Sequence, residues 1–326
     1  MATSDSGNTS GQSKISLLST LQNIPASYLN EITDNLSPDR KLGKGAFGTV
    51  YKGVLPDGGM IAVKKLEENS SVPPEKQFTN EVGNLMAIQH ENIVKLVGSC
   101  YEMQKKVVEH NGKYIIVDVA ETFLCYEYLP RGSLDKYLFE SQRFDWDTRF
   151  NIIKGICKGL HFLHTGMDTP VVHMDIKPDN ILLDDKMAPK ISDFGLSRIF
   201  GKEQTRMNTQ NVVGSLGYLA PEYLYRGEIS TQSDIYSLGL LIIQISTGDK
   251  ITPNNDDKCG TKFIEQVRQK WTLPQITSTY AAFDARRLQE VKICIQIGLE
   301  CVEVERKERP SIVNIIDRLN GKREAK

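Results

Sequence analysis

The feature that most constrains the fold is a short polar segment, from His173 to Asp193, set between apolar runs. It begins HMDIKPDN, continues with Ile-Leu-Leu and ends in Asp-Phe-Gly. The last triplet alone would occur by chance in many proteins, but two acids, a lysine and an amide at these spacings would not. These four residues are Asp175, Lys177, Asn180 and Asp193. The segment predicts a catalytic loop between a helix and short strands.

A second feature is the pattern Gly-x-Gly-x-x-Gly formed by Gly43, Gly45 and Gly48. Alone it is weak, because it also fits a plain glycine-rich hairpin. A dinucleotide-binding fold requires a helix directly after the glycines, whereas residues 49–51 continue as a strand. Glycines at a hairpin tip let backbone amides approach a polyphosphate closely.

The next predicted strand carries Lys64. On its own this lysine fits a solvated surface position equally well, but the preceding glycine loop makes it a candidate for nucleotide phosphates. Such a lysine needs a carboxylate to fix it, and Glu81 lies on the following predicted helix. Without this context Glu81 would be interpreted as an ordinary exposed helical acid.

The charge balance excludes some function classes. Lys+Arg is 40 and Asp+Glu is 41, which argues against a generic nucleic-acid or polybasic membrane binder. The six cysteines form no Cys-x-x-Cys pair, which disfavours a disulfide scaffold or zinc site and fits a reducing compartment. The longest apolar run, from Ile235, is too short to span a bilayer, and Ala2 excludes myristoylation. We expect a soluble, intracellular chain.

The chain divides by composition into five parts. They are a disordered arm at 1–14, a lead-in segment with a short helix at 15–36, a β-rich part with one helix at 37–128, a mainly helical part at 131–320, and a basic tail at 321–326. The expected strands cover 41–66, 93–101 and 114–128, and the expected helices cover 77–89, 146–164, 233–248 and 288–304.

Taken in order, these motifs resemble those of eukaryotic protein kinases. Ala220-Pro221-Glu222, Asp234 and Arg309 continue the match, which covers 37–320. The resemblance implies an α+β, bilobal protein kinase fold with a small β-rich N-lobe, one main helix there, and a larger mainly helical C-lobe. It also implies that Asp234 caps the catalytic-loop backbone and that Glu222 and Arg309 form a buried pair. His173 is expected to be structural.

Longer stretches, such as LGKGAFGTVYKGVLPDGGMIAVKKL and WDTRFNIIKGICKGLHFLH, are similar to plant receptor-like and receptor-like cytoplasmic kinases. These are Pelle-related, and the cysteine-rich receptor-like type is the most similar one we can name. The similarity implies a cytoplasmic protein or the cytoplasmic part of a receptor, peripheral at the plasma membrane through partners. Its expected partners are a protein substrate and a membrane receptor or receptor-like kinase, without nucleic acid.

The resemblance implies ATP and Mg²⁺ as cofactors. Asn180 and Asp193 would bind Mg²⁺, since amide and carboxylate oxygens suit this cation. Asp175 would orient the substrate hydroxyl and accept its proton, while Lys177 would offset charge on the transferred group and is typical of Ser/Thr kinases. Lys64 would hold the phosphates and pair with Glu81.

The resemblance also places the adenine. Leu42, Val50 and Ala62 would lie on one side of it and Leu182 on the other. The segment from Tyr126 to Leu129 would form the hinge. The ATP-binding residues are therefore expected to be Leu42, Gly43, Gly45, Gly48, Val50, Ala62, Lys64, Glu127, Leu129 and Leu182. Tyr126 aligns with the gatekeeper, and its hydroxyl either reaches Glu81 or simply packs in the core.

The sequence departs from the kinase pattern at Met174, which replaces the arginine that meets activation-loop phosphate. We therefore expect activity to depend little on phosphorylation of that loop. Such "non-RD" kinases are associated with immune signalling in plants. Thr205 and Thr209 are exposed candidates for autophosphorylation, and Ser215 is expected to line the substrate groove.

A second departure is the length of the segment 101–121. It fits a harmless hairpin extension or a mis-predicted exon, and it would impair nucleotide binding if it interrupted the strand before the hinge.

The main functional hypothesis is an active Ser/Thr kinase. The alternative is a weakly active or inactive kinase-fold scaffold. A small-molecule phosphotransferase is disfavoured because 214–222 supplies a protein-substrate segment.

Overall fold

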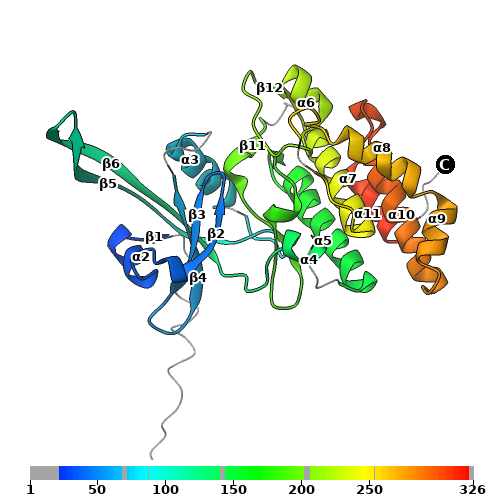
Figure 1. Cartoon of the computed structure of the whole chain (residues 1–326), viewed down its shortest axis with the longest axis horizontal. Coiled ribbons are helices and arrows are strands. Elements are labelled where there is room, and N and C mark those ends of the chain that lie inside the picture. The colour runs from blue at the N-terminus through cyan, green and yellow to red at the C-terminus, as the bar shows by residue number, and fades with distance from the viewer. Residues whose placement is uncertain are drawn as a thin grey trace, which may run out of the picture. The chain divides into compact units, whose positions relative to one another are not determined.

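The structure is a computed structural model that describes residues 22–67, 72–86, 88–139, 144–201, 206–252 and 254–322. Its contacts divide the chain into two compact units (Figure 1). Unit 1 comprises Met1–Ala87 and Lys95–Tyr128, and unit 2 comprises Ile88–Val94 and Leu129–Lys326. The predicted disordered arm at 1–14 lies outside the described residues, as does most of the predicted basic tail.

Unit 1 is built on one sheet with the strand order β1-β5-β6-β4-β3-β2. Five strands are antiparallel, and the short β1 runs parallel to β5. The strands are β1 (Gln22–Asn23), β2 (Lys41–Gly45), β3 (Gly48–Val54), β4 (Met60–Leu66), β5 (Leu96–His110) and β6 (Lys113–Glu127). The expected β-rich N-terminal part is therefore confirmed.

Two helices pack in unit 1. The short helix expected in the lead-in segment forms as α2 (Ala26–Ile32), whose buried side chains join a core with Val63, Val97 and Phe123 from the sheet. The second helix, α3 (Pro74–Leu85), begins three residues before the predicted 77 and ends four before the predicted 89. Proline in the first turn explains the early start, since its missing amide proton costs nothing there.

The strands β5 and β6 form a hairpin that continues well past the ends of β3 and β4 (Figure 1). They pair without interruption from Gly98↔Cys125 to His110↔Lys113. Asn111 and Gly112 close the turn with φ of 51° and 73°, as a type I′ turn requires. The long segment is thus a hairpin extension, and it leaves the strand before the predicted hinge intact, because Ala62 still pairs with Tyr126.

Unit 2 is mainly helical, as predicted. Its helices are α4 (Asp135–Phe139), α5 (Trp146–Thr165), α6 (Pro221–Arg226), α7 (Thr231–Thr247), α8 (Thr261–Lys270), α9 (Leu273–Thr279), α10 (Ala285–Cys301) and α11 (Ile312–Leu319). Its short strands are β7 (Gly132–Ser133), β8 (Val171–Val172), β9 (Ile181–Leu183), β10 (Pro189–Ile191), β11 (Arg198–Ile199), β12 (Met207–Asn208) and β13 (Glu228–Ile229). Helix α7 is buried over nearly its whole length and contacts α5 and α10. In the ranges that the structure describes, no helix is long and apolar enough to cross a membrane.

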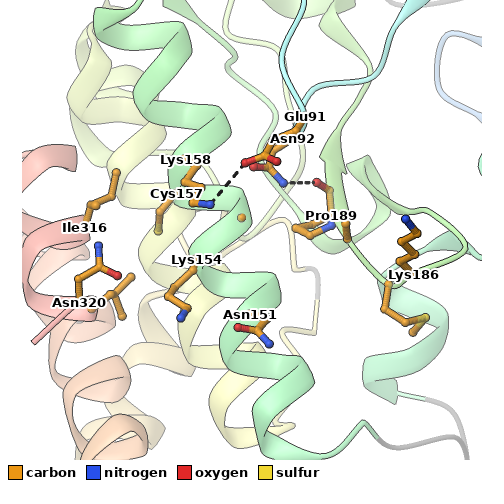
Figure 2. A pocket seen from close by; sticks show the side chains of 14 residues that line it. Glu91, Asn92, Asn151, Lys154, Cys157, Lys158, Lys186, Pro189, Ile316 and Asn320 are labelled. Carbon is orange, nitrogen blue, oxygen red and sulfur yellow. Dashed lines mark hydrogen bonds and ion pairs between the residues drawn. The ribbon is translucent and has the colours of Figure 1, made fainter.

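The segment Ile88–Val94 belongs to unit 2 because it binds β10. Ile191 donates to the carbonyl of Asn92 and accepts from Val94, and the Asn92 side chain donates to the carbonyl of Pro189 at 2.9 Å. A cavity of about 410 Å³ lies beside this contact (Figure 2). Its lysines point in different directions, and Lys158 pairs with Glu91, so they do not converge on one anion.

Candidate active site

In unit 2 the carboxylate of Asp234 fixes the loop that follows β8. It accepts hydrogen bonds from the backbone amides of His173 at 2.7 Å and Met174 at 2.8 Å, as the sequence suggested, and it also contacts His164. Asp234 is only 1% exposed. It lies in the first turn of α7, which begins with a capping box between Ser230 and Ser233. The start of a buried helix therefore sets the backbone of the loop, including the left-handed conformation of Met174 (φ 70°).

The ring of His173 joins this loop to the Asp-Phe-Gly segment. One nitrogen contacts the carbonyl of Ser192 at 3.0 Å, and the other accepts from the amide of Asp175 at 3.2 Å. The ring also lies edge-on to Phe194, with 4.7 Å between centroids. Both ring nitrogens are engaged within the fold, so the geometry supports a structural histidine.

Asp175 lies at the centre of a hydrogen-bonded cluster. Its Oδ2 accepts from Asn180 at 2.8 Å and lies 3.1 Å from the Lys177 ammonium. Its Oδ1 accepts from the Ser215 hydroxyl at 2.7 Å, and Lys177 donates to the same hydroxyl at 2.5 Å. The carboxylate thus already holds an alcohol at the distance from which a general base accepts a proton. Residues from the loop and from the segment before α6 meet here.

The amide of Asn180 has a defined orientation. Its nitrogen donates to the backbone carbonyl and to the carboxylate of Asp175, which leaves its oxygen available as a ligand. Ser192 donates its amide and hydroxyl to the Asn180 carbonyl, and this holds the neighbouring Asp193 near the loop. An amide oxygen and a carboxylate are a donor set that fits Mg²⁺, which is usually bound through one or two carboxylates plus phosphates. Among the described residues there is no group of three or more His, Cys, Asp or Glu side chains that could hold a metal ion.

In unit 1, β4 and α3 bring Lys64 and Glu81 together. The Lys64 ammonium lies 2.7 Å from Glu81 Oε1, and the two residues are 7% and 0% exposed. The hydroxyl of Tyr126 on β6 donates to the other oxygen, Oε2. The bond that the sequence left open is therefore present. A buried carboxylate held by a cation and a hydroxyl fixes the direction of the lysine side chain.

The glycines of the β2–β3 hairpin differ in what they do. A Cβ on Gly43 would meet nothing within 4 Å, and one on Gly45 would meet only the carbonyl of Gly48 at 3.9 Å. A Cβ on Gly48 would lie 2.1 Å from the carbonyl oxygen of Lys65. Gly48 is therefore required for packing against β4, whereas the other two leave the backbone open to a ligand.

The remaining predicted adenine-site residues are divided between the units. Leu42 is exposed, and Val50, Ala62 and Glu127 of unit 1 are half-buried. In unit 2, Leu129 is buried and Leu182 is half-buried. The Glu127 carboxylate accepts from the backbone amide of Lys95 at 2.9 Å, so this predicted hinge residue also anchors the start of β5. That role left no signal in the sequence.

One expectation about the loop before α6 was wrong. Thr209 is half-buried and not exposed, because its backbone amide donates to Gly227 and its hydroxyl donates to the carbonyl of Asn211 at 3.2 Å. Thr205 lies outside the described residues. Ser215 does contact the predicted catalytic residues, through both Asp175 and Lys177.

The chain matches the protein kinase domain family over residues 36–319. It is 38% identical to a G-type lectin S-receptor-like serine/threonine-protein kinase of Arabidopsis thaliana, over 96% of this chain and 36% of the relative. It is 39% identical to the putative cysteine-rich receptor-like protein kinase 20 of the same plant, over 88% of this chain and 41% of that relative. The chain thus spans little more than a third of the length of such curated relatives.

Proposed function

Because this chain belongs to the protein kinase family, we propose that it is an active enzyme that transfers the γ-phosphate of ATP to serine and threonine hydroxyls of proteins. The observation that carries the proposal is the hydrogen bond from the Ser215 hydroxyl to Asp175. It is supported by the neighbouring Lys177 and Asn180, whose cation and amide lie on the same carboxylate.

In this proposal Asp175 orients the attacking hydroxyl and takes up its proton. Phosphoryl transfer depends mainly on positioning and charge neutralisation, so the carboxylate needs only to hold the hydroxyl in line. Lys177 lies within reach of both Asp175 and an alcohol oxygen, and its ammonium offsets negative charge on the group being transferred. Ser215 holds this pair in place until a substrate hydroxyl arrives.

Asn180 and Asp193 are proposed to hold Mg²⁺, which supplies charge neutralisation at the phosphates of ATP. The amide orientation of Asn180 supports this, since only its oxygen is left for a cation. Lys64 is proposed to bind the phosphates while Glu81 keeps its ammonium in place. Removing that carboxylate would take away the ion-pair partner of a buried ammonium, which is costly.

We propose the following residues as those that bind ATP: Leu42, Gly43, Gly45, Gly48, Val50, Ala62, Lys64, Glu127, Leu129 and Leu182. Tyr126 acts as gatekeeper. The proposed kinase domain is 37–320, with lobes 37–128 and 131–320.

The proposed setting is receptor-linked signalling or immunity in a plant, on the cytoplasmic side and at the plasma membrane through a receptor partner. It rests on the names of the relatives, which are plant receptor-like kinases, and on Met174, which cannot bind a loop phosphate. A weakly active or inactive scaffold is the second candidate. Met174 favours it, whereas the presence of Lys64, Asp175 and Asp193 in the sequence supports the active enzyme.

The deciding experiment is phosphate transfer from labelled ATP with Mg²⁺ by the purified chain, with modified residues mapped by mass spectrometry. We expect phosphoserine and phosphothreonine, and loss of transfer in Asp175→Asn and Asp193→Ala. Asp185→Asn is the matched control, because Asp185 is an exposed acid of the same unit. A folded wild-type chain that binds ATP but transfers nothing would support the scaffold instead.

A further inference from the structure

The outer part of the β5–β6 hairpin is a two-stranded ribbon, and one of its faces carries exposed apolar side chains between the charged Lys105, Glu109 and Asp118. On this ribbon face, defined by Met103, Val107, Tyr114 and Ile116, the exposed fractions of Val107 and Ile116 are 67% and 69%. Val107 pairs directly with Ile116 across the strands, so their side chains lie on one side. A two-stranded hairpin alone is marginally stable in water, and an exposed apolar ribbon indicates an interaction surface.

The edge of β5 is also open. In the described residues, β1 pairs with β5 only at Gly98 and Ser99, and no strand lies beside β5 from Tyr101 to His110 on that side. Such an edge is a template for pairing with another strand. The ribbon therefore offers both an apolar face and a row of backbone groups.

The hairpin turn determines which backbone groups point outward. In a two-residue hairpin the flanking residues, here His110 and Lys113, exchange hydrogen bonds, and the bonded pairs alternate from there. The odd-numbered residues of β5 then turn their amides and carbonyls away from β6. Ser99 agrees with this, because its carbonyl accepts from Ile24 on the outer side at 2.9 Å.

We propose that this edge pairs with the same edge of a second copy of the chain, antiparallel about a twofold axis at Val107. Outward backbone groups then meet, since odd-numbered residues face odd-numbered residues. The Val107 and Ile116 side chains of the two copies form a continuous apolar row across four strands.

The charges of the ribbon support a second copy as the occupant. In this register Lys105 of each copy lies opposite Glu109 of the other, and Lys105 already faces Asp118 within its own hairpin. The ammonium is thus flanked by a carboxylate on either side, which is favourable for cross-strand neighbours. The ribbon has no strong net charge that would select an acidic or basic partner, since it carries three lysines and four acids: Lys105, Lys106, Lys113, Glu102, Glu109, Asp118 and Glu121.

The expected dimer is weak. A single pair of short strand edges buries less than the ~1,200 Å² of a stable interface, so we expect dissociation constants in the micromolar range. The test is sedimentation equilibrium of the full chain from about 1 to 300 µM. We expect a monomer–dimer equilibrium for the wild type.

Charge reversal tests the register. Lys105→Glu and Glu109→Lys should each weaken dimerisation at least about tenfold, because each puts like charges opposite one another twice per dimer. The double variant should restore it. Lys186→Glu is the control, since this exposed lysine lies in unit 2. Single and double variants that weaken the dimer equally, or not at all, would overturn the register.

Val107→Pro tests the edge itself. The Val107 amide points outward, so proline removes no bond within the hairpin, but it blocks pairing across the axis. We expect a folded monomer with an unchanged thermal midpoint. A wild-type chain that stays monomeric throughout the range, or a dimer that survives Val107→Pro, would sink the proposal.

Discussion

Arg309 and Glu222, which are 87 positions apart, form a buried two-pronged ion pair. Arg309 Nη1 lies 2.9 Å from one carboxylate oxygen of Glu222, and Nη2 lies 2.7 Å from the other. The guanidinium also donates to the carbonyls of Gln232, Glu303 and Val304 and lies 5.0 Å from the ring centroid of Tyr236. One arginine thus links the start of α6, the start of α7 and the segment after α10.

We predict that Arg309→Met destabilises unit 2 by about 3–5 kcal/mol, because it leaves the Glu222 carboxylate buried without its cation. Arg309→Lys should recover only part of the lost stability, since an ammonium cannot form the two parallel hydrogen bonds that the guanidinium makes with the carboxylate. Urea unfolding of the purified variants measures both. Arg226→Met is the control, because Arg226 is exposed and its contact with Glu228 is long, at 3.9 Å. Equal midpoints for Arg309→Met and the control would contradict the prediction.

The Tyr126–Glu81 hydrogen bond leads to a second prediction. Tyr126→Phe keeps the ring and removes the hydroxyl, so Glu81 keeps only Lys64 of these two partners. A bond to a charged group contributes about 1.5–3 kcal/mol, and we expect a stability loss of that size in thermal unfolding. Tyr114→Phe, at an exposed ribbon position, should change nothing measurable. A loss below about 0.5 kcal/mol for Tyr126→Phe would show that the hydroxyl is not needed.

A third prediction concerns the lead-in helix. Leu29 on α2 is fully buried against the sheet of unit 1, so Leu29→Ala should cost about 2–5 kcal/mol by removing packed methyl groups. Leu273→Ala, at a largely exposed position of α9, should stay within about 0.5 kcal/mol of the wild type. Chemical denaturation compares them. Similar values for the two variants would mean that α2 adds little to the fold.

The cysteines give a prediction about chemical reactivity. All six are buried free thiols, and burial raises the pKa of Cys100, Cys125, Cys157 and Cys259 to about 12. Because the thiolate is the reactive form, it is nearly absent at pH 7.5 and grows only as the pH approaches 12. A thiol-labelling reagent at pH 7.5 should therefore modify the cysteines of the native chain slowly. In denaturant, the same reagent should modify all six cysteines. Rapid labelling of any cysteine in the native chain would contradict this.

Much of the fold followed from local patterns. The helix at Trp146 was placed almost to the residue, because Asp145 caps it and its apolar spacing is regular. The strand lengths of the hairpin were not foreseen, since alternation fades where both faces of a ribbon are exposed. Helix α3 starts earlier than predicted because Pro74 begins it, and the spacing of apolar residues gives no signal at a proline.

The candidate site could be anticipated from the sequence where its chemistry requires a residue type, as in the pairing of Lys64 with Glu81. It was not predictable where backbone geometry decides. Nothing in the sequence marks Ser192 as the residue that binds the Asn180 carbonyl, because a serine there has many ordinary roles. Likewise Thr209 looked exposed in a polar loop, yet Gly227 from the end of α6 accepts its amide proton.

Two hydrogen bonds hold β5 at the base of the ribbon, and we call this pair of bonds the clamp. Ile24 donates to the carbonyl of Ser99, and the amide of Ala26 donates to the carboxylate of Glu102 at 3.1 Å. The sheet is several strands wide up to this point and only two strands wide beyond it, so bending stiffness falls abruptly there. A sideways load on the hairpin tip therefore flexes the ribbon outside the clamp. The wider part of the sheet, where Tyr126 pairs with Ala62, bends less than the ribbon under the same load.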